Sequence, residues 1–282
     1  MIDTSFLDEL RRFSLIIRKR VTSKYTGEKK SLAEGRGLVF KDHRVYAPGD
    51  DIRLIDWKVY ARTDDLYVKR YEEERNLVVH IIIDSSASMN FGKRIKKFEY
   101  ASMIGVGFAF LAMKDNEKFQ FATFSEGLQT FRPEKGMSQV ASMVMHLNES
   151  KPSGHSMIHE SIMRYKRHIN SRSLIILISD FLINAEEIKN ALYRLGGHDI
   201  KAVQVLDPVE RNFDLEGDMK LKDSETDEQL KTHISPRLQK EYQQRMDAHV
   251  NDIADTCTRL GADFYTVTTD TPIFDAFYRL LK

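Results

Sequence analysis

Oxygen-bearing side chains gather where one buried strand is predicted to end. The stretch "HIIIDSSASMNFG" (residues 80–92) runs from an apolar segment into Asp84, and Ser85, Ser86 and Ser88 follow within the next four residues. The alternate spacing D-x-S-x-S lets a turning backbone direct the aspartate and two of the serines toward one point. A carboxylate and hydroxyls at a strand's carboxyl end can bind a metal ion, attack a substrate or cap the next helix.

A second apolar segment, "SLIILISDF" (residues 173–181), also ends in an aspartate, Asp180. In an open α/β sheet, ligands bind outside the carboxyl ends of the strands, near the point where the strand order reverses. Two carboxylates and several hydroxyls, with no histidine or cysteine among them, are hard oxygen ligands. They suit Mg²⁺, with Mn²⁺ or Ca²⁺ as alternatives, rather than zinc or copper.

The elements that must position these residues alternate between strands and helices. Strands are predicted at residues 66–74, 77–83, 118–124, 173–181, 200–206 and 262–269. Segments with apolar residues at helical spacing lie between them, and a long helix is predicted after Pro236, with Cys257 inert on its apolar side. Alternating strands and helices with continuously apolar central strands are typical of a parallel sheet covered by helices on both faces.

Composition places the chain among ordinary globular proteins. It has 282 residues, of which 41% are hydrophobic and 30% charged, and a formal net charge of +1. This charge removes any general electrostatic case for nucleic acid or an anionic membrane as the partner. A single cysteine excludes an internal disulfide framework and a cysteine-rich zinc site. No apolar run approaches the roughly 18 residues of a membrane helix, and the N-terminus lacks signal-peptide features, so we expect a cytoplasmic protein.

Two segments precede the first buried strand. Residues 4–21 carry apolar side chains at helical spacing, and the stretch at residues 34–63 is dense in glycine, arginine, aspartate and aromatics but poor in strand or helix signals. Within it we expect Asp50 or Asp51 to cap one short helix. We also expect Arg44, Arg53 and Arg62 to pair with Asp50, Asp56 or Glu72. The predicted domains are residues 1–74, the N-terminal helix and signature segment, and residues 75–282.

The strand-end motif "DSSAS" resembles the first motif of the metal-ion-dependent adhesion site in von Willebrand factor A domains. "GHSMIHESI" is similar to the threonine motif of that site, with Ser156 at the threonine position, and "LISDF" matches the last motif. His155 stands where a glycine is usual. The resemblance implies a von Willebrand factor A-like fold, a Rossmann-like, doubly wound, mostly parallel sheet with helices on both faces. It also implies a metal held by Asp84, Ser86, Ser88, Ser156 and Asp180.

The segment before the first buried strand resembles the signature of domain-of-unknown-function family 58. The resemblance rests on "PGDD", "RLIDW" (Arg53–Trp57) and the glutamates that follow. The later stretch "DPVERNFDLEGDMKLKDSETDEQL" is similar to that family's hairpin after the fourth A-domain strand. The family implies a bacterial or archaeal protein that works with a MoxR-type AAA+ ATPase as an adaptor or in chaperone-like assembly.

Three classes of function remain open. The favoured one is metal-dependent protein–protein recognition without catalysis, in which a partner's aspartate or glutamate fills the open metal position. A metal-dependent phosphoesterase would use Asp84 and Asp180 but needs a base, for which only His155 or His159 is nearby. Neither the G-x-S-x-G elbow of serine hydrolases nor a Walker loop is present. The third class is a structural scaffold with a vestigial metal site.

Overall fold

The computed structural model describes residues 2, 5–12, 39–72, 78–224 and 229–281. The chain divides into two compact units: a larger unit of residues 1–16 and 77–282, and a smaller unit of residues 17–76. Within the helix predicted at residues 4–21, residues 5–12 are helical, and its remainder, with the basic stretch that follows, lies outside the described residues.

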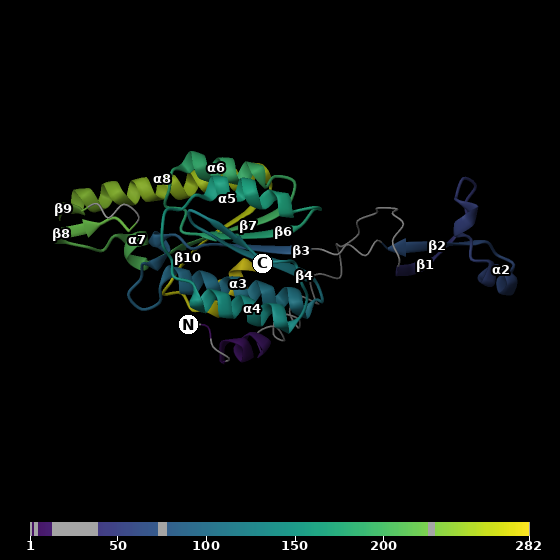
Figure 1. Cartoon of the computed structure of the whole chain (residues 1–282). Helices are drawn as coiled ribbons and strands as arrows, with labels where there is room; N and C mark the ends of the chain where they lie inside the picture. The colour runs from purple at the N-terminus through teal and green to yellow at the C-terminus, as the bar shows by residue number, and fades with distance from the viewer. Residues whose placement is uncertain (1, 3–4, 13–38, 73–77, 225–228, 282) are drawn as a thin grey trace. The chain divides into compact units, whose positions relative to one another are not determined.

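A six-stranded sheet in the order β10-β7-β6-β3-β4-β5 forms the centre of the larger unit (Figure 1). All neighbouring strands are parallel except β4 and β5, which pair antiparallel. This confirms the predicted mostly parallel α/β sheet. The strands are β3 (Val78–Asp84), β4 (Lys118–Phe124), β5 (Leu128–Thr130), β6 (Leu174–Ser179), β7 (Asp199–Leu206) and β10 (Asp263–Thr268).

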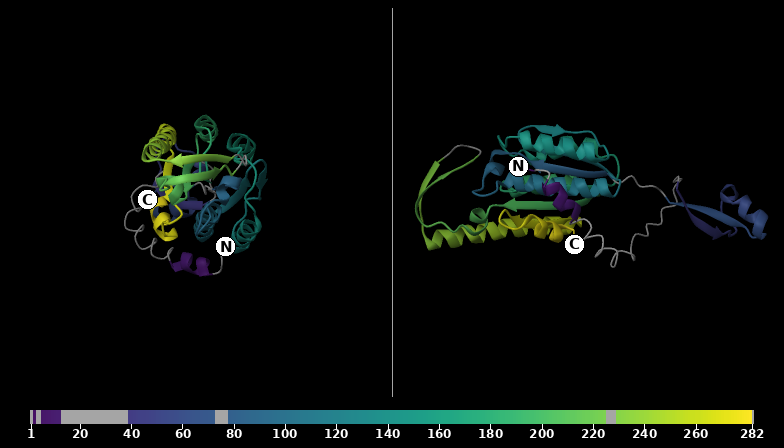
Figure 2. Two further views of the ribbon diagram at one scale, coloured as in Figure 1. Left: turned by 90° about the vertical axis from the view of Figure 1, so that its left-hand side faces the viewer. Right: turned by 90° about the horizontal axis from the view of Figure 1, so that it is seen from below.

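Helices cover both faces of the sheet, as the two views of Figure 2 and the labels of Figure 1 show. Successive side chains of a strand point to opposite faces, so Ile81 and Ile83 join one buried cluster and Ile82 the other. One cluster packs against α3 (Lys97–Lys114), α4 (Met137–Glu149) and α9 (Ile273–Leu280), the other against α5 (Ile158–Tyr165), α6 (Ala185–Arg194) and α8 (Pro236–Leu260).

No helix among the described residues has the length and apolarity that crossing a bilayer requires.

The N-terminal helical residues belong to the larger unit through their apolar side. Ile2, Phe6 and Leu10 are buried in the cluster that contains α3 and α4. The chain start is also held by two hydrogen bonds with one side chain of α4: the Ile2 N–H donates to Asn148 Oδ1 over 3.0 Å, and Asn148 Nδ2 donates to the Ile2 carbonyl over 2.9 Å.

A two-stranded hairpin, β8 (Gly217–Lys222) and β9 (Gln229–Ile234), follows the short helix α7 (Pro208–Asn212). The hairpin and the first part of α8 extend beyond the edge of the sheet at which β3, β6 and β7 end (Figure 1). Ile234 is the one residue of β9 that is buried. The position agrees with the hairpin that the family resemblance predicts.

The smaller unit corrects two expectations. It contains a strand that the sequence did not reveal, β1 (Val39–Val45), paired antiparallel with β2 (Tyr67–Glu72). The sequence of β1, "VFKDHRV", has no apolar alternation, and its pairing with β2 is what makes it a strand. The single predicted helix is instead two, η1 (Ile52–Leu54) and α2 (Trp57–Thr63).

An aspartate precedes each of these short helices. Asp51 caps η1, and Asp56 accepts hydrogen bonds from the first backbone N–H groups of α2. Arg44 pairs with Asp50 over 2.7 Å as expected, whereas Arg53 pairs with Asp51 over 2.9 Å. Arg53 pairs with Asp51 because the two residues lie in the same turn, two positions apart.

Candidate functional site

Hydroxyl groups from two distant segments donate to the buried carboxylate of Asp84. Its Oδ2 accepts hydrogen bonds from Ser156 Oγ and Ser179 Oγ, each over 2.7 Å, and its Oδ1 accepts the Ser86 N–H over 2.8 Å. Ser86 Oγ lies 3.1 Å from Ser88 Oγ. We call these five residues the strand-end network. Four of them were predicted from the sequence.

The network lies where the order of the sheet reverses. From β3 the chain passes to β4 on one side, and later to β6, β7 and β10 on the other. Ile83 pairs with Ile178, so Asp84 and Ser179 follow at the same height on adjacent strands. Such a switch point leaves an open crevice at the carboxyl ends of the strands, which is where ligands bind in α/β sheets. We call this side of the sheet the carboxyl edge.

Backbone hydrogen bonds hold the loops of the network together. The Ala87 N–H donates to the Gly154 carbonyl and the Ser153 N–H to the Ser85 carbonyl, each over 2.9 Å. These bonds join the loop after β3 to the loop before α5. Ser86 is the N-cap residue of the short helix η2 (Ala87–Asn90), yet its side chain makes no capping hydrogen bond. Helix capping therefore does not account for the Ser86 hydroxyl.

Asp180, the second predicted carboxylate, is paired with a buried lysine. Lys97 Nζ donates to Asp180 Oδ2 over 2.8 Å and to Glu210 Oε1 over 2.7 Å, and the Lys97 side chain is completely inaccessible to solvent. The remaining oxygen of Asp180, Oδ1, accepts the Leu182 N–H over 3.1 Å. We call Lys97, Asp180 and Glu210 the ion triad. It lies beside the strand-end network, because Asp180 directly follows Ser179 in the chain.

Sequence reasoning missed Lys97, Glu210 and Ser179, and only some of them left a signal. Ser179 is a polar end to an otherwise apolar strand, directly before Asp180, and was readable. Glu210 belongs to the capping box "DPVE", in which Asp207 and Glu210 cap the start of α7, but its second role as a partner of Lys97 is not local. Lys97 carries no pattern, since it is the first residue of a long apolar helix.

The electrostatics of the site show a deficit of positive charge. Burial and then the negative charge of Asp180 raise the pKa of Asp84 to about 6, although three hydrogen bonds oppose the rise. Burial lowers the pKa of Lys97, but the carboxylates of Asp180 and Glu210 outweigh it and leave the pKa raised. Burial raises the pKa of Glu210, with Lys97 opposing. The site thus has three carboxylates and one ammonium group, which pairs with Asp180 and Glu210.

This donor set fits a hard divalent cation. Its side chains offer only oxygen and, when all are ionised, two negative charges in excess. In the described part of the chain there is no group of three or more histidine, cysteine, aspartate or glutamate side chains that could hold a metal. A metal ion held here would need the serine hydroxyls as further ligands, as the sequence motif predicts. Of these hydroxyls, that of Ser156 donates to Asp84, whereas those of Ser86 and Ser88 lie within hydrogen-bond distance of each other.

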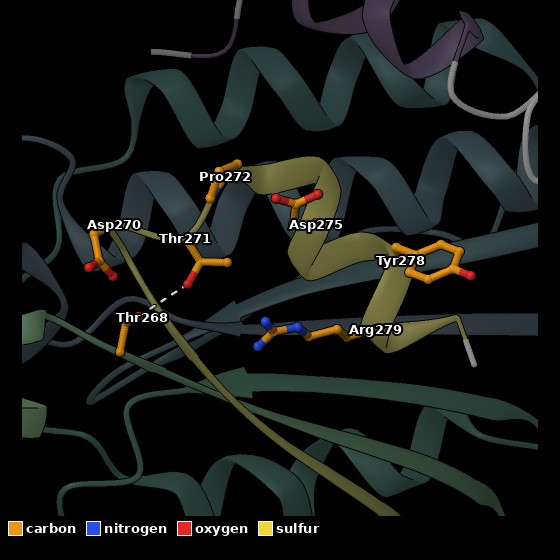
Figure 3. A pocket seen from close by; sticks show the side chains of 7 residues that line it. All are labelled: Thr268, Asp270, Thr271, Pro272, Asp275, Tyr278 and Arg279. Carbon is orange, nitrogen blue, oxygen red and sulfur yellow. Dashed lines mark hydrogen bonds between the residues drawn. The ribbon is translucent and has the colours of Figure 1, made fainter.

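The cavity in Figure 3 is lined by other residues than those of the strand-end network and the ion triad. About 510 Å³ in volume, it lies between the end of β10 and the start of α9. Its lining residues are Thr268, Asp270, Thr271, Pro272, Asp275, Tyr278 and Arg279.

Comparison with known proteins identifies relatives without an assigned activity. Residues 42–252 match the family described as "Protein of unknown function DUF58". An uncharacterized protein of Mycobacterium bovis is 25% identical over 273 residues, which are 95% of this chain and 86% of the relative. An uncharacterized protein of Mycobacterium avium is 30% identical over 119 residues, 42% of this chain and 69% of the relative.

Two solved structures are similar over most of their own length. The conserved hypothetical protein BatB from Bacteroides thetaiotaomicron has a TM-score of 0.46 and 18% identity, covering 73% of this chain and 97% of its own. An aerotolerance-related membrane protein from Bacteroides fragilis has a TM-score of 0.45 and 17% identity, covering 73% and 96%.

Proposed function

The chain belongs to the DUF58 family of proteins of unknown function, and from this premise we propose that it is a metal-dependent protein–protein interaction module. One observation carries the proposal: the cluster of side chains at the switch point of the sheet has three carboxylates, those of Asp84, Asp180 and Glu210, but one cation, Lys97. Buried carboxylates without a counterion are costly, and they are retained where a ligand supplies the missing charge.

In this proposal Asp84, Ser86, Ser88 and Ser156 hold Mg²⁺, directly or through water, and Asp180 completes the set. The bound ion supplies an open coordination position for a carboxylate oxygen of a partner protein. The chain's own groups keep the ligands in place: Ser179 anchors Asp84, and Lys97 orients the carboxylate of Asp180. The sheet order and the strand-end ligands support assigning the larger unit to the von Willebrand factor A-like fold.

The family resemblance extends the proposal to the cellular setting. We propose that the chain is a bacterial, cytoplasmic adaptor or chaperone-like partner of a MoxR-type AAA+ ATPase. The ATPase would present the carboxylate that reaches the metal. The alternatives are a scaffold that binds its partner without metal and a metal-dependent phosphoesterase that uses the same aspartates.

Calorimetric titration of Mg²⁺ into the EDTA-stripped chain tests the proposal. We expect saturable binding by the wild type and none by Asp84→Ala. Asp252→Ala, which removes an exposed carboxylate of α8, is the matched control and should bind like the wild type. Absence of binding in the wild type would favour the scaffold. Hydrolysis of para-nitrophenyl phosphate that Asp84→Ala abolishes would favour the phosphoesterase.

A further inference from the structure

Three apolar side chains beside the strand-end network face solvent. Phe91, Met157 and Leu182 are 38%, 37% and 36% exposed. Each is tied closely to a site residue: the Phe91 N–H donates to the Ser88 carbonyl, Met157 directly follows Ser156, and the Leu182 N–H donates to the Asp180 side chain. We call Phe91, Met157 and Leu182 the apolar rim.

Phe91 makes two contacts with Lys97 of the ion triad, one through its ring and one through its backbone. Its ring centroid lies 5.9 Å from Lys97 Nζ, within the range of a cation–π contact, and its carbonyl accepts the Lys97 N–H over 2.9 Å. The ring therefore has one face near the buried ammonium group and the rest available to a partner. Aromatic side chains held in this way are frequent anchors of protein interfaces.

The exposure of Leu182 depends on a strained residue. Phe181 has φ 51°, a left-handed conformation that is rare for a bulky side chain. Its own ring is fully buried, and its carbonyl oxygen lies 2.6 Å from His249 Nε2. The turn thus sends Asp180 into the site, Phe181 into the core and Leu182 to the surface. Strain of this kind persists where surrounding contacts impose it, and it is enriched at functional sites.

A cationic loop follows the aromatic member of the rim. Lys93, Arg94 and Lys96 are exposed, and we call them the basic loop. Lys96 Nζ donates to Asn90 Oδ1, while no described acidic side chain forms an ion pair with Lys93 or Arg94. The acidic group on the other side of the network, Glu126, accepts the His155 N–H.

A glycine fixes the path of the basic loop. Gly92 has φ 133°, and a Cβ at this position would lie 2.4 Å from the Ile95 carbonyl oxygen. The loop therefore turns tightly between η2 and the start of α3, so its cations stay close to Phe91 and to the ion triad. The positive end of the α3 dipole lies at the same place.

We propose that the apolar rim and the basic loop together form a docking face for an acidic segment of a partner protein, one in which apolar side chains alternate with carboxylates. One carboxylate of that segment would reach the metal, a contact that rests on the proposed function. The others would meet Lys93 and Arg94, while an apolar side chain packs against Phe91, Met157 and Leu182. Opposite charges speed association and select the partner, whereas the desolvated apolar contacts supply affinity.

The test uses a short fluorescein-labelled peptide of alternating leucine and aspartate, titrated with the full chain in Mg²⁺ and followed by fluorescence anisotropy. We expect binding that weakens by about tenfold, equivalent to about 1.4 kcal/mol, in Phe91→Ala and again in Lys93→Glu/Arg94→Glu. Peptides that alternate serine with aspartate, or leucine with lysine, should bind at least about tenfold more weakly than the leucine–aspartate peptide.

Two controls match these variants. The control for Phe91→Ala is Met145→Ala, which removes an exposed apolar side chain on α4. The control for the charge reversal is Lys166→Glu/Arg167→Glu, which reverses an exposed Lys–Arg pair at the opposite edge of the sheet, before β6. Both should bind like the wild type. Lack of peptide binding, or equal binding by the rim and control variants, overturns the docking face.

Measuring peptide binding with and without metal separates the docking face from the metal-dependent function. Binding that survives EDTA and Asp84→Asn but is lost in the rim variants supports the docking face and contradicts the metal-dependent function. Binding that EDTA abolishes, but that the rim variants leave unchanged, supports the metal site and overturns the docking face.

Discussion

Asp84 in the larger unit and Asp56 in the smaller unit are both nearly inaccessible, yet their pKa values move in opposite directions. A hydrogen bond with His43 is the main reason that the pKa of Asp56 falls to about 2, and Lys69 and two backbone N–H groups add to it. Burial and the charge of Asp180 raise the pKa of Asp84 to about 6, because its own donors are neutral hydroxyls and one amide.

The difference separates a carboxylate that has charge-assisted partners from one that has only neutral hydrogen-bond donors. Asp56 has His43 and the Lys69 ammonium group beside it and caps α2, so its charge stabilises the local fold. Asp84 has hydrogen bonds but no cation of its own, since the nearby ammonium group is already shared by Asp180 and Glu210. A divalent ion would do for Asp84 what His43 and Lys69 do for Asp56.

The largest expected effect comes from removing the buried cation. Lys97→Met leaves Asp180 and Glu210 buried without a counterion, and we expect a loss of about 3–5 kcal/mol in the free energy of unfolding, measured by urea denaturation. Adding Glu210→Gln to Lys97→Met should restore part of the loss. If Lys97→Met were as stable as the wild type, the ion triad would not be the buried pairing described above.

A pH titration without metal should sharpen the contrast between the two aspartates. The folded pKa of Asp84 lies above its unfolded value, so the folded state binds an extra proton between about pH 4 and pH 6. The stability of the larger unit should therefore increase as pH falls through that window, by on the order of 2 kcal/mol.

Asp56 should behave in the opposite way, because its folded pKa lies below its unfolded value. Its contribution is complete above about pH 4 and is lost as pH falls toward about 2. Hydrogen exchange read separately for residues 78–88 and 52–60 measures both trends. In Asp84→Asn the change in residues 78–88 between pH 6 and pH 4 should disappear. The same pH response in both segments would contradict the assigned environments.

The smallest effect is expected from an exposed ion pair of the smaller unit. The Arg53 side chain is 84% exposed and that of Asp51 43%, so water and salt screen their attraction. Arg53→Gln should leave the unfolding transition unchanged within error, and the pair serves as the control for Lys97→Met. A large loss in this variant would mean that exposure does not explain the difference between the two pairs.

Much of the fold could be predicted because its signals are local. The apolar runs that became β3 and β6 were recognisable, and so were the aspartates that end them, since a buried parallel strand must be apolar throughout. The strand β1 was missed because its polar sequence forms a strand only by pairing with β2. The break between η1 and α2 was missed because a second aspartate, Asp56, starts its own helix.

The sequence by itself determined which oxygen ligands stand at the carboxyl edge, because strand length and the D-x-S-x-S spacing are properties of consecutive residues. The tertiary structure alone decided which of the carboxylates has a cation. Lys97 and Glu210 are 113 positions apart and meet because α3 and α7 both begin at that edge. Charge compensation depends on distances of a few ångströms through space, and no pattern along the chain reports those distances.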